Sequence, residues 1–96
     1  MRSNNGTHQG LMNIVAGVGI TQGLDVQVDI EYGKGQIDVL INELYYEVKS
    51  NYSQKAFKKS YNQIERAMKN NMCSYGYLVT PDGVFDVFKN KLVGGD

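Results

Sequence analysis

Residues 37–50 read IDVLINELYYEVKS, and this stretch decides the fold that we expect. Alternating apolar positions predict one strand over Gln36–Ile41 and a second strand over Leu44–Ser50. Asn42 and Glu43 lie between them and are expected to form a tight turn. The stretch therefore predicts a β-hairpin.

The expected hairpin brings two acids and a lysine together. With a turn centred on residues 42 and 43, the numbers of facing residues sum to about 85, so Asp38 faces Glu47 or one of its neighbours. Residues two apart on a strand share a face, so Glu47, Lys49 and Tyr45 are expected to point the same way. Val48 points to the opposite side.

The rest of the chain supplies helices and strands on both sides of the hairpin. Apolar residues recur at helical spacing in two segments, and they alternate with polar residues in others. We expect a helix over His8–Val18, capped by Thr7 and ended by Gly17, Gly19 and Gly23, a strand over residues 25–31, a turn at Gly33–Gly35, a helix over Gln54–Asn71 capped by Ser53, a strand over Tyr75–Thr80, a turn at Pro81–Gly83 and a strand over Val84–Phe88.

Composition limits the classes of protein that fit this order. A chain of 96 residues with 42% apolar residues suits one α/β domain spanning residues 1–96, with a single modest core. We expect residues 1–6 and 93–96 to be flexible. No segment resembles a signal peptide or a membrane span, so we expect a soluble intracellular protein, cytoplasmic and without a membrane partner. Zero formal net charge disfavours a protein that coats nucleic acid by bulk electrostatics.

The residue types restrict the metal chemistry. The chain has one cysteine, Cys73, and one histidine, His8, which excludes a disulfide within the chain and a Cys/His zinc site. Asp38, Glu47 and a backbone carbonyl form instead a hard oxygen site that suits Mg²⁺, with Mn²⁺ as a substitute. Two carboxylates with a lysine beside them fit metal-assisted phosphodiester cleavage, in which Lys49 positions water or stabilises the transition state.

The same residues have a simpler interpretation. An acid and a lysine two positions apart are common on exposed strands, where they form a solvated face or a cross-strand ion pair. Under that interpretation the chain is a small α/β interaction protein, and the spacing of Asp38, Glu47 and Lys49 has no catalytic meaning.

Three segments carry a resemblance to a known family. Residues 35–38 (GQID), residues 47–50 (EVKS) and Gln63 on the following helix resemble the PD-(D/E)XK nuclease superfamily. The similarity covers roughly residues 7–88 and is strongest to small Holliday junction resolvase-like and VRR-NUC-type stand-alone nucleases of archaeal, viral or phage origin. It implies a restriction-endonuclease-like αβββαβ core, with a central mixed sheet flanked by helices.

The resemblance also implies roles for individual residues. Asp38, Glu47 and the carbonyl of Val48 would hold the metal, Lys49 would be the catalytic lysine, and Gln63 would orient the lysine or a water. Members of the family often carry a further glutamate on the first helix. No acid occurs here between Arg2 and Leu24, so the metal site is either less complete or filled by His8, which lies near that place with Gln9.

The expected partners follow from the resemblance and from a basic helix face. Lys55, Lys58 and Lys59 are candidates for contacts to DNA phosphates, which position a duplex without reading its sequence. We expect a metal-dependent, structure-selective DNA endonuclease, and a homodimer that buries apolar surface of the first helix or of Val84–Phe88. The alternative is a nucleic-acid-binding module with a nuclease-like fold and weak or no catalysis.

Overall fold

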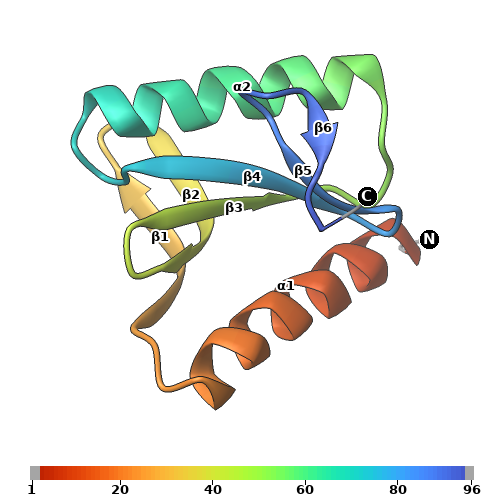
Figure 1. The fold of residues 1–96 in the computed structure, drawn as a ribbon, viewed down its shortest axis with the longest axis horizontal. Helices are drawn as coiled ribbons and strands as arrows, with labels where there is room; N and C mark the ends of the chain where they lie inside the picture. The colour runs from red at the N-terminus through yellow and green to blue at the C-terminus, as the bar shows by residue number, and fades with distance from the viewer. Residues whose placement is uncertain (1–2, 95–96) are drawn as a thin grey trace.

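The computed structural model describes residues 3–94, which form two helices and one six-stranded sheet (Figure 1). The predicted α/β class, with a mixed sheet flanked by helices, is confirmed. Within the described residues, neither helix combines the length and the apolar character that crossing a membrane requires. The elements are α1 (Ser3–Thr21), β1 (Val26–Tyr32), β2 (Gly35–Ile41), β3 (Leu44–Val48), α2 (Gln54–Lys69), β4 (Tyr75–Thr80), β5 (Gly83–Asp86) and β6 (Lys91–Leu92).

The sheet follows the order of the chain from β1 to β6. The first three strands form the predicted antiparallel meander, and Ile41 pairs with Leu44 across the predicted turn. Val39 pairs with Tyr46, which is the register that the hairpin predicts. Strand β4 is parallel to β3, because α2 connects them as a crossover. The two remaining pairings are antiparallel.

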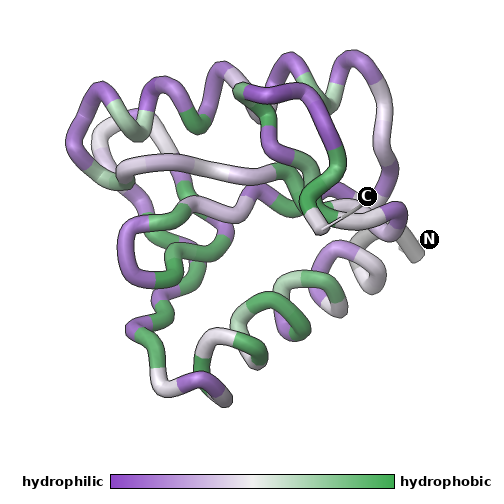
Figure 2. The backbone as a smooth tube through the Cα atoms, viewed as in Figure 1, coloured by the Kyte–Doolittle hydropathy of each residue, from purple (hydrophilic) through white to green (hydrophobic). Residues whose placement is uncertain are grey.

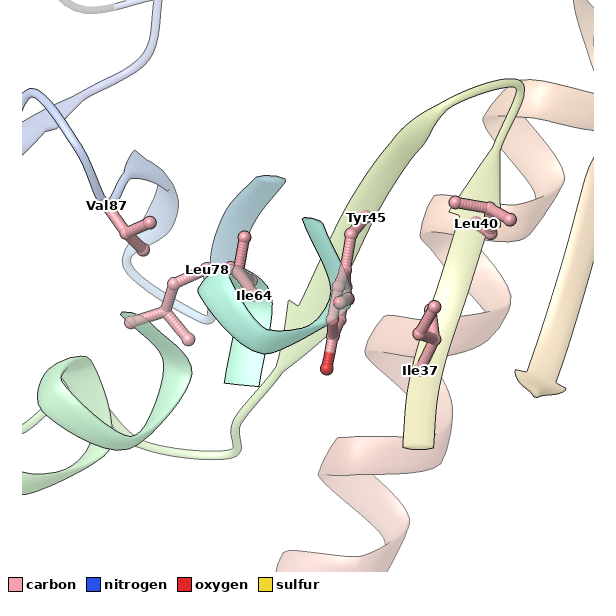
Figure 3. Close-up of a cluster of buried hydrophobic side chains, with 7 residues drawn as sticks. Ile37, Leu40, Tyr45, Ile64, Leu78 and Val87 are labelled. Carbon is pink, nitrogen blue, oxygen red and sulfur yellow. The ribbon is translucent and has the colours of Figure 1, made fainter. Parts of the chain in front are cut away.

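The helices cover opposite faces of the sheet, α2 on one side and α1 on the other (Figure 1). Each face has its own apolar cluster. Between α1 and the sheet, Met12 of the helix packs in a cluster with Val39, Ile41, Val48 and Val79. The cluster beside α2 includes Ile37, Leu40, Tyr45, Ile64, Ala67, Leu78 and Val87, most of which Figure 3 labels. Burying a large aliphatic side chain contributes roughly 1.5–3 kcal/mol, so both clusters hold the three layers together.

Helix α1 is longer than predicted. It begins at Ser3, so the predicted N-cap at Thr7 was wrong, and residues 1 and 2 lie outside the described part. Gly19 lies inside the helix and does not end it. A Cβ added at residue 19 would come 2.7 Å from Cγ2 of Val26, so only glycine allows this close contact with the sheet. The helix ends at Thr21, and Gly23 follows with a φ of 75°, where its N–H donates to the carbonyl of Ile20 and closes the C-terminal turn.

Helix α2 begins where the sequence predicts. The Ser53 side chain accepts a hydrogen bond of 3.0 Å from the N–H of Ala56, which confirms the predicted N-cap. The helix ends at Lys69, two residues before the predicted end, because Asn70 caps it and Asn71 has a left-handed φ of 60°. Strand β3 likewise ends at Val48, two residues before Ser50.

The C-terminal segment differs from the prediction. Strand β5 covers Gly83–Asp86 rather than Val84–Phe88, because the Asp86 carboxylate accepts hydrogen bonds from the N–H groups of Phe88 and Lys89 and stabilises a turn. The turn leads into β6, which the sequence did not predict. The N–H of Val93 donates to the carbonyl of Val84 at 2.7 Å, so residue 93 is held against the sheet, and residues 95 and 96 lie outside the described part.

Candidate active site

A cleft of about 320 Å³ lies where β2 begins and β3 ends. It collects the two acids, the lysine and the glutamine that the sequence singles out, and it also contains His8. Its walls come from both helices, both strands and the segment after β3. The lining residues are His8, Gln36, Asp38, Glu47, Val48, Lys49, Ser50 and Gln63.

Asp38 lies at an irregular point of the sheet. Asp38 has no paired residue in the regular register on either side. Strand β1 pairs with β2 at Val28–Val39 and at Ile30–Ile37, which skips Asp38. The β2–β3 pairing stops at Val39, one residue away from it. The residue that would face it on β1, Asp29, has a left-handed φ of 50°. The N–H of Val48 donates 2.9 Å to Oδ2 of Asp38, so a carboxylate replaces the carbonyl that a regular ladder would supply.

Glu47 is buried, with 4% of its surface exposed, and both carboxylate oxygens have partners. The hydroxyl of Tyr45 lies 2.6 Å from Oε1, and the ammonium of Lys49 lies 3.2 Å from Oε2. Burial raises the pKa of Glu47, and the neighbouring charge of Asp38 raises it further, while the contacts with Tyr45 and Lys49 lower it. The net direction is upward, so the cleft opposes a second negative charge.

The two helices reach the cleft from opposite layers. From α1, Nε2 of His8 lies 3.5 Å from Oδ2 of Asp38, so the histidine does occupy the place beside the acid that the sequence suggested. From α2, Oε1 of Gln63 is buried and accepts no hydrogen bond within the part of the chain that the structure describes. A buried polar atom without a partner is costly, and this one lines the cleft. A ligand, a water or a metal in the cleft would satisfy it.

The three lysines predicted to contact DNA phosphates lie outside the cleft. Lys55, Lys58 and Lys59 are all exposed on α2, and none of them lines the cleft. At 3.6 residues per turn, Lys59 lies about 40° around the helix from Gln63, whereas Lys58 lies about 140° from it. Lys59 is therefore the best placed of the three to contact a molecule that enters the cleft.

Sequence reasoning assigned no role to two residues that line the cleft, Gln36 and Ser50, or to Tyr45 beside it. The buried hydroxyl of Tyr45 contacts Glu47 and lies 3.0 Å from the carbonyl oxygen of Gln36. One hydroxyl hydrogen serves only one of these acceptors at a time. The alternation of 45, 47 and 49 on one face was the available signal. Gln36 stands two residues before Asp38, and Ser50 follows Lys49, so both lie next to predicted residues.

The cleft meets the needs of a hard divalent cation only in part. Among the residues that the structure describes, no group of three or more His, Cys, Asp and Glu side chains is arranged to hold a metal. Mg²⁺, however, keeps several waters and binds through one or two carboxylates together with substrate phosphates. Asp38 and Glu47 provide these carboxylates, and the unpartnered oxygen of Gln63 fits a water of such an ion. The residues fit a site with two carboxylates completed by water and phosphate.

Comparisons with family models, with curated proteins and with solved structures found no match to this chain. The function is therefore inferred from the geometry of the cleft and from the residues that line it.

Proposed function

We propose that this protein is a metal-dependent DNA endonuclease with a restriction-endonuclease-like αβββαβ core of the PD-(D/E)XK kind. The observation that carries the proposal is the convergence of Asp38, Glu47, Lys49 and Gln63 in one cleft, with Lys49 ion-paired to Glu47. The order of the first six elements, α1 to β4, supports the proposal, and β5 and β6 follow it. A chance acid–lysine pair on an exposed strand would not leave Glu47 buried or share a cleft with a helix glutamine.

The proposed reaction is hydrolysis of a phosphodiester. Water attacks the phosphorus atom and gives up one proton to solvent, the bond from phosphorus to the leaving oxygen breaks, and the leaving oxygen takes up one proton from solvent. A bound Mg²⁺ or Mn²⁺ would polarise the phosphate and lower the pKa of a bound water. Lys49, which lines the cleft, would stabilise the charge that develops on the phosphate oxygens, and the oxygen of Gln63 would orient the water or the lysine.

DNA is the proposed substrate, and branched DNA such as a four-way junction is the preferred form. This preference comes from the resemblance. The exposed lysines 55, 58 and 59 would contact backbone phosphates, which is a positioning role without base recognition.

We also propose that the protein works as a homodimer through α1. Of the two apolar surfaces expected for a dimer, only the helix remains exposed, with Ile14 at 63% and Val18 at 52%. The other surface is partly used inside the molecule, since Val87 is 2% exposed and Phe88 packs against the rings of Tyr61 and Tyr75. Figure 2 shows hydrophobic residues along the middle of α1, and the helix carries no Asp, Glu, Lys or Arg. A second copy of this face meets it without repulsion between like charges.

A second candidate function is nucleic-acid binding by the same fold, with weak or no catalysis. Both oxygens of Glu47 are engaged by Tyr45 and Lys49, and the described residues hold no third acid beside them. These contacts favour a nucleic-acid-binding module in which the charge of Glu47 is neutralised by Lys49. The two functions differ in whether DNA is cut when a divalent metal is added.

A cleavage assay separates the two. The protein is incubated with a four-way junction and with a linear duplex, in Mg²⁺, in Mn²⁺ or in EDTA. We expect metal-dependent cutting that is lost on substitution of Asp38→Asn, Glu47→Gln or Lys49→Ala, with rates at least ~100-fold lower because each change removes charge stabilisation of the transition state. Glu65→Gln on α2, outside the cleft, is the matched control and is expected to cut like the wild type.

The outcomes have distinct meanings. Binding of both DNAs without cutting in any metal supports the second function and contradicts the first. Equal cutting by wild type and by the three cleft variants would show that the activity lies elsewhere. No binding of DNA at low salt contradicts both functions and leaves the small interaction protein.

A further inference from the structure

A second pocket, of about 460 Å³, lies beside the cleft between the β1–β2 turn and the C-terminal turns of α2. Figure 1 shows these two parts of the chain at the same end of the molecule. The lining includes two basic side chains and contains no acid. It consists of Tyr32, Gly33, Lys34, Gly35, Arg66, Asn70 and Met72.

The two cations of this pocket have no counter-ion. Lys34 and Arg66 are both exposed, and within residues 6–94 neither forms an ion pair. They come from parts of the chain that are distant in sequence, since Lys34 lies in the turn after β1 and Arg66 lies near the end of α2. Two unpaired cations converging on a pocket without carboxylates form a site for an anion. A guanidinium is suited to a phosphate because its planar fork donates two hydrogen bonds at once.

The residues that line the pocket are close in sequence to residues that line the cleft, on β2 and on α2. Gly35 lines the pocket and the next residue, Gln36, lines the cleft. On α2, Gln63 lines the cleft, and Arg66 lies about one helical turn further, a rise of about 4.5 Å. Tyr32 lines the pocket with Arg66. Burial raises the pKa of its hydroxyl, Arg66 lowers it, and Cys73 and Glu47 raise it.

We propose that this pocket binds a backbone phosphate of the same nucleic-acid strand that enters the Asp38–Glu47 cleft. The inference rests on the proposed function. The nucleic-acid strand is expected to run along α2 from Gln63 in the cleft toward Asn70 in the pocket. Asn70 lies a further rise of about 6 Å beyond Arg66. Phosphates of one strand are spaced about 3.4 Å along the axis of a duplex, so the bound phosphate lies roughly one to three nucleotides from the scissile bond.

The test measures binding of the full chain to a short DNA duplex in EDTA, where no cutting occurs. Lys34→Ala and Arg66→Ala are each expected to reduce the slope of log affinity against log salt by about one, because each removes one phosphate contact. The double variant is expected to bind about ten-fold more weakly. Lys69→Ala removes the same charge from an exposed position of α2 outside the pocket and is expected to change the affinity by less than about two-fold.

A set of duplexes locates the phosphate. Each duplex carries one neutral methylphosphonate in place of a phosphate, and the wild type is expected to lose affinity at one flanking position. The double variant Lys34→Ala/Arg66→Ala is expected to be insensitive at that position, while Lys69→Ala remains sensitive. All variants change exposed side chains, and equal melting temperatures would confirm that they fold.

Each result decides the proposal separately from the enzyme activity. If the double variant shows the same methylphosphonate profile and the same salt slope as the wild type, the pocket is not a phosphate site, even when the protein cuts DNA. If the profile changes as expected and no metal supports cutting, the pocket proposal stands and the nuclease proposal fails. Binding of inorganic phosphate at Lys34 and Arg66 without any binding of DNA would overturn the nucleic-acid occupant.

Discussion

Glu47 is the residue in which burial and charge oppose each other most directly. It lies almost completely buried beside Asp38, and its pKa in the folded protein is raised above the ordinary value of 4.5. Between these two pKa values the folded state binds more protons than the unfolded state. The contribution of Glu47 to the free energy of unfolding is therefore full at acid pH and is lost as the pH rises through the raised pKa.

Glu47→Gln removes this dependence. In EDTA, the melting temperature of the variant relative to the wild type is expected to increase as the pH rises from about 4 to about 7, because ionised Glu47 destabilises only the wild type. Glu65→Gln controls for the loss of one negative charge outside the cleft. A relative melting temperature for Glu47→Gln that falls over the same pH range would contradict the direction assigned to the pKa.

At the scale of the elements, α1 offers two glycines with opposite surroundings. A Cβ added at Gly17 meets nothing within 4 Å, whereas one added at Gly19 meets Val26 at 2.7 Å and Ile41 at 3.0 Å. Gly17→Ala is expected to stabilise the protein by about 0.5–1 kcal/mol, because alanine favours a helix. Gly19→Ala is expected to destabilise it by about 1–3 kcal/mol through overpacking, partly offset by the same helix preference.

Urea denaturation of both variants measures the difference. The two substitutions add the same methyl group to the same helix, so each serves as the control for the other. Equal effects of the two would show that α1 does not pack closely on β1 and β2.

At the scale of the whole molecule, the exposed apolar face of α1 sets the expected assembly. Ile14→Lys together with Val18→Lys places charges on that face, and we expect the double variant to be monomeric under conditions in which the wild type is a dimer. Light scattering after size-exclusion chromatography measures the mass. Val28→Lys changes a residue of similar exposure, 47%, on β1 and is expected to leave the dimer intact. A monomeric wild type would contradict the proposed dimer.

Much of the sheet could be predicted from local sequence. The turn at Asn42 and Glu43 and the alternation on either side of it predict the hairpin and its register, since a strand shows one face to the core at every second residue. The cap at Ser53 is equally local, because it depends on a side chain and an N–H three residues away. The end of α1 was predicted wrongly, because Gly17 and Gly19 look like terminators until the sheet that packs on Gly19 is known.

The sequence by itself determined that Asp38, Glu47 and Lys49 come together, because short-range alternation and a two-residue turn fix which strand residues face each other. Only the tertiary structure decided what surrounds them. The packing of both helices on the sheet brings His8 and Gln63 from opposite layers into one cleft. The same packing brings Lys34 and Arg66 into one pocket. The irregular register at Asp38 is also a feature of the folded sheet. Packing joins residues that are distant in the chain, and no local pattern specifies which of them meet.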